Sequence, residues 1–86
     1  MTFLRTESFR RDFQALSPEI QEQVEKALRR MGTDLRHRSL RVKKMQPKAR
    51  GIFEARVTRS FRMTFTLEGD VVLLRRVGTH DILKTP

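Results

Sequence analysis

The stretch from residue 61 to residue 77 constrains the fold more than any other part of the chain. Large apolar side chains stand at every second position from Phe61 to Leu67, and Arg or Thr fills the positions between them. This period of two predicts a β-strand with one buried face and one polar face. Residues 68–70 (Glu-Gly-Asp) predict a hairpin turn, and the largely apolar run 71–77 predicts a second strand. Such a hairpin needs another layer to cover its apolar face.

The N-terminal third of the chain supplies that layer as two helices. Apolar residues at spacings of three and four predict helices over residues 7–16 and 18–31. Ser17 and Pro18 are typical of a helix N-cap and first helical position, and Ser8 is a candidate cap for the first helix. Gly32 stands where a helix is expected to end. The short link between the helices predicts an αα-hairpin.

Three further segments complete the predicted sheet. Residues 2–5, 40–45 and 52–57 each show a short strand-like pattern, and turn or loop residues separate the last two. The expected order is one strand, two helices and four strands within a single domain spanning residues 1–86. The sequence therefore predicts an α+β fold with an N-terminal helical hairpin packed on one face of a small antiparallel β-sheet.

Positive charge is concentrated in the middle of the chain. The formal net charge is +9, and residues 29–62 carry twelve Lys and Arg against two acids, a net of +10. Of the 19 basic residues 14 are Arg, whose planar guanidinium binds phosphate through two parallel hydrogen bonds. A patch of this density predicts a polyanion or an acidic protein as partner; the alternative is a solvated basic face without a specific ligand.

Several classes of site and location find no support in the sequence. The chain has no Cys, which excludes disulfides and thiolate metal ligands and suits a reducing compartment. It shows no signal-peptide pattern and no apolar run of membrane-spanning length. Two isolated His residues do not form a metal motif, and no Gly-rich phosphate loop is present. We therefore expect a cytoplasmic protein that needs neither a metal nor a cofactor and does not enter a membrane.

The predicted sheet brings a set of charged side chains together. Strand alternation sends Glu54, Arg56 and Arg62 to the face that the helices leave uncovered, and Arg76 and His80 stand near the end of the last strand. Arginines are fixed positive charges that stabilise the charge on a reacting phosphate. Histidine and glutamate can transfer protons in general acid–base catalysis. These are the groups that cleavage of an RNA phosphodiester without a metal requires.

Each of these residues also has a structural interpretation. Glu54 either acts as the base or forms a cross-strand ion pair with one of the arginines. Arg75 competes with Arg76 for the position beside the site. His80 either transfers a proton, caps the C-terminal segment or pairs with Asp81. The sequence alone leaves these alternatives open.

The order of the segments resembles a known family. A basic Leu-Arg-Val-Lys-Lys-Met segment (40–45) is followed by Gly-Ile-Phe-Glu-Ala-Arg-Val (51–57), Ser-Phe-Arg-Met-Thr-Phe (60–65) and Leu-Leu-Arg-Arg-Val-Gly-Thr-His (73–80). Together these segments resemble the RelE/ParE toxin superfamily of type II toxin–antitoxin modules over nearly the whole chain.

The resemblance implies a function and a set of partners. RelE-like members are ribosome-dependent mRNA endonucleases that cut the codon in the ribosomal A site, and a cognate antitoxin covers their basic surface. We expect a free monomer or an assembly bridged by the antitoxin. ParE-like members share the fold but inhibit DNA gyrase, and a non-catalytic RNA-binding module is a further alternative. Many RelE-like nucleases use a Tyr near the C-terminus, which this chain lacks.

The resemblance and the charge pattern together give the candidate site residues. The nuclease positions that the resemblance matches are Arg56, Arg62, Arg76 and His80, with Lys43 or Lys44. The predicted catalytic residues are His80, Arg62, Glu54 and Arg76. The predicted RNA-binding residues are Lys43, Lys44, Arg56, Arg41, Lys48 and Arg50.

Overall fold

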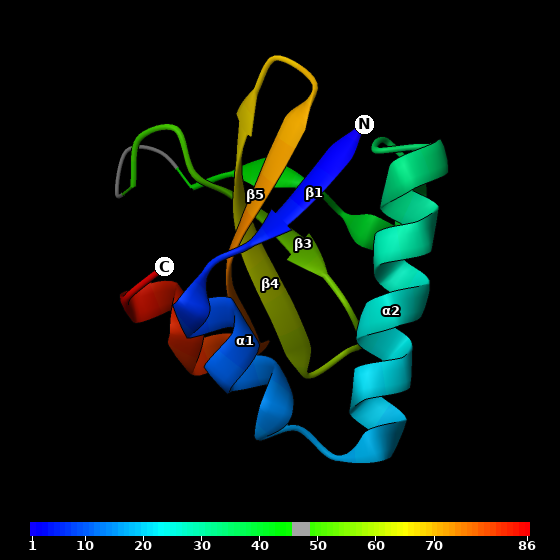
Figure 1. The fold of residues 1–86 in the computed structure, drawn as a ribbon, viewed down its shortest axis with the longest axis vertical. Coiled ribbons are helices and arrows are strands. Elements are labelled where there is room, and N and C mark those ends of the chain that lie inside the picture. Colours follow the sequence, from blue (N-terminus) through cyan, green and yellow to red (C-terminus); the bar gives the residue numbers. More distant parts are fainter. Residues whose placement is uncertain (46–48) are drawn as a thin grey trace.

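A computed structural model describes residues 1–45 and 49–86 and contains two α-helices, five strands and two 3₁₀ segments within these ranges (Figure 1). In chain order the elements are β1 (Thr2–Arg5), α1 (Glu7–Gln14), α2 (Pro18–Thr33), η1 (Arg38–Leu40), β2 (Lys43–Lys44), β3 (Phe53–Arg56), β4 (Phe61–Glu68), β5 (Val71–Thr79) and η2 (His80–Lys84).

The strands form one sheet in the order β1-β5-β4-β3-β2. The predicted α+β class is confirmed, but the sheet is mixed: β1 runs parallel to β5, whereas the other neighbours are antiparallel. The β4–β5 hairpin leaves the far edge of β5 open, and β1 fills the first half of that edge. Pairing of the first strand with the last one cannot be read from local patterns, because their partners are about 70 residues apart.

Both helices pack against the same face of the sheet (Figure 1). Phe9 of α1 and Met31 of α2 are fully buried against Ala55, Met63 and Phe65 of the inner face. A bulge in β5 lets residues three apart, Leu74 and Val77, both face this core. The core members are Phe9, Val24, Ala27, Met31, Leu40, Ala55, Met63, Phe65, Val72, Leu74 and Val77.

The helix ends show which local signals were sufficient. Ser17 caps α2 by accepting a hydrogen bond from Ile20 N–H, with Pro18 in the first turn, as predicted. The cap of α1 is Thr6 and not Ser8, because Thr6 Oγ1 lies 3.1 Å from Phe9 N. The end predicted at Gly32 is wrong by about one residue: α2 includes Thr33, and its C-cap Asp34 N–H still bonds to Arg30 O.

The strand predicted over residues 40–45 is mostly wrong. Residues 38–40 form η1, Arg41 takes a left-handed conformation (φ 45°), and only Lys43 and Lys44 pair with β3. His37 caps η1, since its Nδ1 accepts from Ser39 N–H at 3.2 Å. The turn directs Leu40 into the core, where it is almost completely buried. Core burial therefore outweighs the strand-like pattern here.

The C-terminal segment lies on the outer face of the sheet, which is the face opposite the helices. Thr64 is fully buried there, and its Oγ1 donates to Pro86 O at 3.1 Å. Ile82 of η2 packs over Gly78: a Cβ at Gly78 would lie only 2.8 Å from Ile82 Cγ2. The outer face is thus covered over β5 and remains available over β3 and part of β4.

The second half of the β5 edge is closed by side chains of the N-terminal segment instead of a strand. Val77 N–H donates to Asp12 Oδ2 at 3.1 Å, and Thr6 Oγ1 donates to Arg75 O at 3.0 Å. Arg76 forms a two-point ion pair with the same carboxylate, with Nε–Oδ2 at 2.7 Å and Nη2–Oδ1 at 3.2 Å. Asp12 therefore joins α1 to β5 at the point where β1 ends.

We predict that Gly78→Ala destabilises the fold by about 1–3 kcal/mol, because the new methyl group displaces the branched side chain of Ile82. Urea unfolding followed by circular dichroism measures the change. Gly32→Ala is the matched control, since its Cβ would meet Phe3 at an ordinary 3.7 Å within a helix, and we expect a gain of about 0.5–1 kcal/mol. Unchanged stability of Gly78→Ala would contradict the packing of η2 on this glycine.

We further predict that Asp12→Ala lowers the free energy of unfolding by about 1.5–3 kcal/mol, because the edge N–H and the half-buried Arg76 both lose their acceptor. Asp12→Asn keeps an oxygen for Val77 N–H and should lose less. A double-mutant cycle with Arg76→Ala isolates the ion pair. Additive effects of Asp12→Ala and Arg76→Ala would show that the pair contributes nothing to stability.

Candidate active site

Strand register places the candidate residues in two neighbouring rows on the outer face. In the first row Lys43 pairs with Glu54, Glu54 with Thr64, and Thr64 with Arg76. Directly paired residues have their side chains on the same face, with Cβ atoms about 5 Å apart. In this row the Glu54 carboxylate on β3 thus lies between Lys43 on β2 and Arg76 on β5, all on the same face of the sheet.

In the second row Arg56 pairs with Arg62, and Arg62 with Gly78. Phe61 pairs with Thr79, so exposed His80 stands two residues beyond Gly78 in the chain, at the same end of the sheet as this row. The structure therefore brings Glu54, Arg56 and Arg62 together, as strand alternation suggested. His80 is exposed and directly follows the end of β5.

Arg62 is held by its neighbours in the β3–β4 turn. Its Nη1 donates to the carbonyl oxygens of Thr58, Arg59 and Phe61 at 3.0, 3.2 and 3.2 Å. Its Nε lies 3.9 Å from Glu54 Oε1, and both side chains are mostly buried. The cross-strand ion pair considered for Glu54 is thus present, with a long separation. This arrangement fixes the orientation of the guanidinium without saturating its hydrogen-bonding capacity.

Arg56 lies in a cluster of like charges. Burial and the nearby guanidinium groups of Arg41, Arg62 and Arg59 lower the pKa of Arg56 from its ordinary value. Its Nε donates to Thr58 O at 3.4 Å. Four arginines that repel one another form a surface on which a bound phosphate would relieve the repulsion.

Arg76 does not join this cluster. Its ion pair with Asp12 raises the pKa of Arg76, and burial opposes part of that rise. The Nη1 group donates to Thr85 O and Thr85 Oγ1 at 3.1 and 3.0 Å. Arg75, the competing candidate, donates through Nε to Pro86 O at 3.1 Å. Both arginines are thus engaged with the C-terminal segment, and Arg76 is also held by α1.

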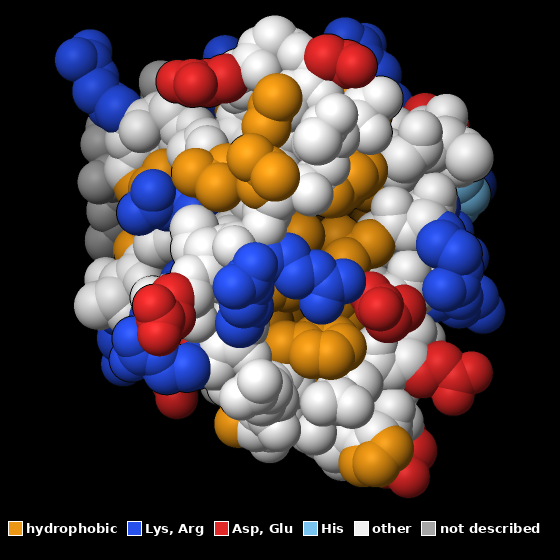
Figure 2. Space-filling view, in the orientation of Figure 1, with side chains coloured by type: hydrophobic (Ala, Val, Ile, Leu, Met, Phe, Trp, Pro, Cys, Tyr) orange, Lys and Arg blue, Asp and Glu red, His pale blue; other side chains and the backbone are white. Residues whose placement is uncertain are grey.

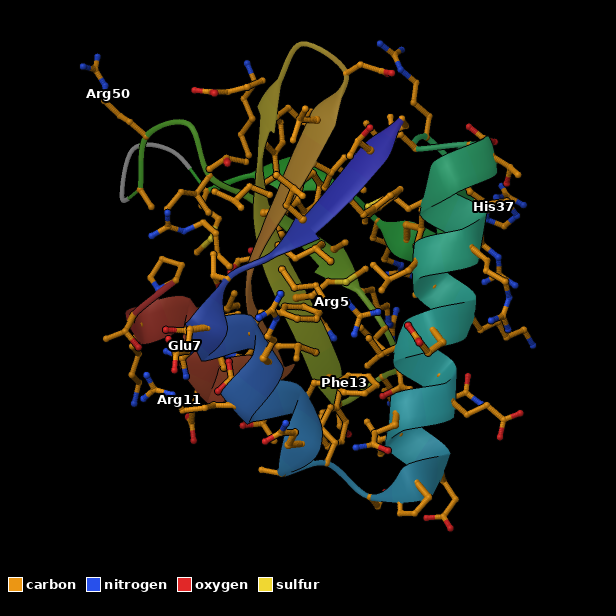
Figure 3. The ribbon with its side chains drawn as sticks, in the orientation of Figure 1. Arg5, Glu7, Arg11, Phe13, His37 and Arg50 are labelled. Atoms are coloured by element: carbon orange, nitrogen blue, oxygen red, sulfur yellow. The ribbon has the colours of Figure 1, made fainter. Side chains whose placement is uncertain are left out.

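The remaining predicted RNA-binding residues lie around the open part of the sheet. Lys43 and Lys44 on β2 are exposed, and so is Arg41, two residues before Lys43. Arg50 extends away from the sheet on the side opposite α2 (Figure 3). Lys48 lies outside the described residues. The exposed basic side chains flank the two rows and do not enter them, apart from Lys43.

Sequence reasoning missed two residues that shape the site. Asp12 has no local signal, because its partners Arg76 and Val77 are more than 60 residues away in the chain. Arg59 was counted in the basic stretch but not assigned to the site. Its position between two predicted strands was the available signal, since a short turn brings it beside Arg56.

Two further findings concern the described residues. No three His, Cys, Asp or Glu side chains within residues 1–45 and 49–86 gather closely enough to hold a metal ion. In the same ranges, α1 and α2 are both too short or too polar to cross a membrane.

Comparison with solved structures places this fold among toxins of toxin–antitoxin modules. The YoeB/ParE toxin from Agrobacterium tumefaciens superimposes with a TM-score of 0.79 at 15% identity, covering 93% of this chain and 99% of that one. YafQ from E. coli gives a TM-score of 0.79 at 13% identity, with 94% of each chain covered. The RelB–RelE antitoxin–toxin complex from Methanococcus jannaschii gives 0.75 at 16% identity, with 95% of each chain covered.

Comparison of sequences finds no relative, whereas comparison of structures does. No protein-family profile matches the chain, and no curated protein sequence is significantly similar to it. The structural matches nevertheless extend over nearly the full length of both chains. The chain therefore has the fold of the RelE-like toxins, as the sequence resemblance predicted.

Proposed function

We propose that this protein is the toxin of a type II toxin–antitoxin module and that it cuts mRNA in the ribosomal A site. The observation that carries the proposal is the pairing of Arg56 with Arg62 on the outer face. Glu54 lies beside them, and His80 follows the end of the row. The fold of RelE-like toxins supports the same class of function.

The arginines supply electrostatic stabilisation of the transition state. When the 2′-oxygen attacks the phosphorus, the non-bridging oxygens gain negative charge that a fixed guanidinium can bind. Arg62 is preorganised by its contacts to the turn carbonyls, so no reorientation is required during the reaction. Arg56 is paired with Arg62 on the neighbouring strand, and a bound phosphate would stabilise its positive charge against the repulsion of the nearby arginines.

Glu54 and His80 provide for the two proton transfers. In the proposed reaction Glu54 accepts the proton of the 2′-hydroxyl, and His80 donates a proton to the departing 5′-oxygen. The bond from phosphorus to the 5′-oxygen breaks as the bond to the 2′-oxygen forms, which leaves a 2′,3′-cyclic phosphate. The carboxylate is shielded at the centre of the outer face, whereas the imidazole is exposed at its end, where a leaving group can depart.

The proposed partners follow from charge and fold. Lys43, Lys44 and Arg41 would bind RNA phosphates beside the site, with Lys48 and Arg50 following in the chain. A cognate antitoxin would cover the same basic surface, in the way that the structures of the RelB–RelE and DinJ–YafQ complexes each pair a toxin with its antitoxin. The protein would act on ribosomes in the cytoplasm, as a free monomer or released from an antitoxin-bridged assembly.

A second candidate function is inhibition of DNA gyrase by a ParE-like mechanism. It is favoured by the engagement of Arg76 with Asp12 and Thr85, which removes one of the nuclease positions that the resemblance matched. The lack of a Tyr near the C-terminus also favours this second candidate, because many RelE-like nucleases use one.

We predict that the purified protein produces discrete cuts at A-site codons of a defined mRNA, and only when ribosomes are present. Primer extension in a reconstituted translation system measures the cuts. His80→Ala should lower the cleavage rate by about 10²–10⁴-fold. Arg62→Lys keeps the charge but loses the planar fork and should lower it by about 10²-fold. Lys84→Ala, an exposed change in η2, is the control and should cut normally.

Three outcomes would change this assignment. Intact mRNA at doses that arrest growth would remove the nuclease proposal, and accumulation of gyrase cleavage complexes would then identify the ParE-like function. Cleavage without ribosomes would remove the ribosome dependence. Full cleavage by a folded His80→Ala variant would remove the proposed role of His80 while leaving the nuclease itself in place.

A further inference from the structure

A second basic surface lies beside the β3 edge, separate from most of the candidate active site. It is an open groove of about 710 Å³ between α2, η1 and the β3–β4 turn, and we call it the basic groove. Among its described lining residues none is acidic. Its cations are Lys26, Arg30, Arg38, Arg41, Arg56 and Arg59.

The basic groove shares Arg41, Arg56 and Arg59 with the arginine cluster beside the candidate active site. Glu54, Arg62 and His80 do not line it. Short β2 pairs only with Phe53 and Glu54 of β3. On the β2 side, the edge of β3 is therefore unpaired at Arg56 and opens towards the groove, while β4 pairs with its other edge. Figure 2 shows Lys and Arg side chains along the α2 side of the molecule, below a histidine at the place of His37 in Figure 3.

The groove is held in shape by neutral groups. Arg30 Nη1 donates to Ser39 Oγ at 2.8 Å, and Ser39 Oγ lies 2.8 Å from His37 Nδ1. On the opposite wall Arg62 binds the carbonyl oxygens of Thr58 and Arg59 and so fixes the turn that carries Arg59. Because these acceptors carry no charge, the cations are positioned without being neutralised. The pKa of Arg56, which burial and its arginine neighbours lower, is a further sign of this unbalanced charge.

The lining indicates which polyanion fits. Ala27 and Val57 are its only apolar members among the described residues, so a protein segment would gain little from apolar burial. No aromatic side chain lines the described groove, and single-stranded nucleic acid usually needs such side chains for base stacking. Six of the described lining residues are cations, so the lining favours contacts to phosphates, which a helical RNA stem presents regularly along its backbone.

We propose that the basic groove binds the phosphate backbone of a double-stranded RNA stem, while a separate single strand occupies the outer face. The inference rests on the proposed function for its choice of RNA. It adds to that function an anchoring site that contributes affinity without chemistry. Binding would be independent of base sequence and strongly dependent on salt.

The test is binding of a fluorescently labelled RNA hairpin with a stem of roughly 12 base pairs, measured by anisotropy with the full chain. Lys26→Gln/Arg30→Gln should weaken binding by about tenfold or more and reduce the magnitude of the negative salt slope, d log K/d log[salt], by about two. Arg10→Gln/Arg29→Gln removes the same charge from exposed positions outside the groove and should change affinity by less than about threefold. Thermal melts confirm that both variants fold.

Several results would overturn the inference. Equal losses in the two variants would show diffuse charge attraction, and stronger binding of an unpaired RNA of equal length would exclude a stem site. If poly-glutamate displaces the labelled stem at a lower concentration than unlabelled stem RNA does, and if this displacement requires Lys26 and Arg30, the groove would be assigned to an acidic protein. His80→Ala should bind the stem normally. Normal stem binding by a protein that cuts no mRNA would reject the proposed nuclease and keep the groove.

Discussion

The contact between Asp12 and Arg76 is the interaction on which the arrangement of this small protein depends. One carboxylate accepts from the Arg76 guanidinium at two points and from the edge N–H of Val77, and the same guanidinium reaches Thr85. It therefore joins α1, β5 and the segment after η2. An open strand edge would otherwise expose unpaired backbone groups where β1 ends. Asp12, together with Thr6, thus forms the hydrogen bonds to this edge that a longer β1 would form.

Scarcity of acids decides which arginines are structural. The chain has 10 acidic residues for 19 basic ones. Glu25 holds Arg5, which lies between the helices and 5.2 Å from the Phe13 ring centroid (Figure 3). Asp12 holds Arg76, and Glu54 holds Arg62 loosely. The arginines of the basic groove receive neutral partners or none among the described residues. The placement of a few carboxylates thus separates arginines that stabilise the fold from arginines that remain available for an anion.

Local signals predicted the elements whose partners are near in the chain. The Ser17 cap, the alternation along β4 and the turn before β5 led to the correct helices and hairpin. The parallel pairing of β1 and the engagement of Arg76 could not be predicted, because both depend on partners more than 60 residues away. The segment around Leu40 was mistaken for a strand, since burial of that leucine in a 3₁₀ turn leaves the same local pattern. For the site, strand alternation correctly placed Glu54 on the same face as Arg56 and Arg62, but it gave no means of ranking the arginines.

Arg56 connects the two surfaces, and its position has a consequence for substrate selection. It pairs with Arg62 on the outer face and also lines the basic groove, so a phosphate bound on either side lowers the repulsion that Arg56 experiences. Under the proposed function, a stem in the groove would reduce the net charge available to the outer face while holding the RNA close to it. Affinity would then come mainly from the groove, and the outer face would be free to favour the transition state over the bound strand. Such a division suits a nuclease that must ignore free RNA and act only where a folded RNA and an unpaired strand lie side by side.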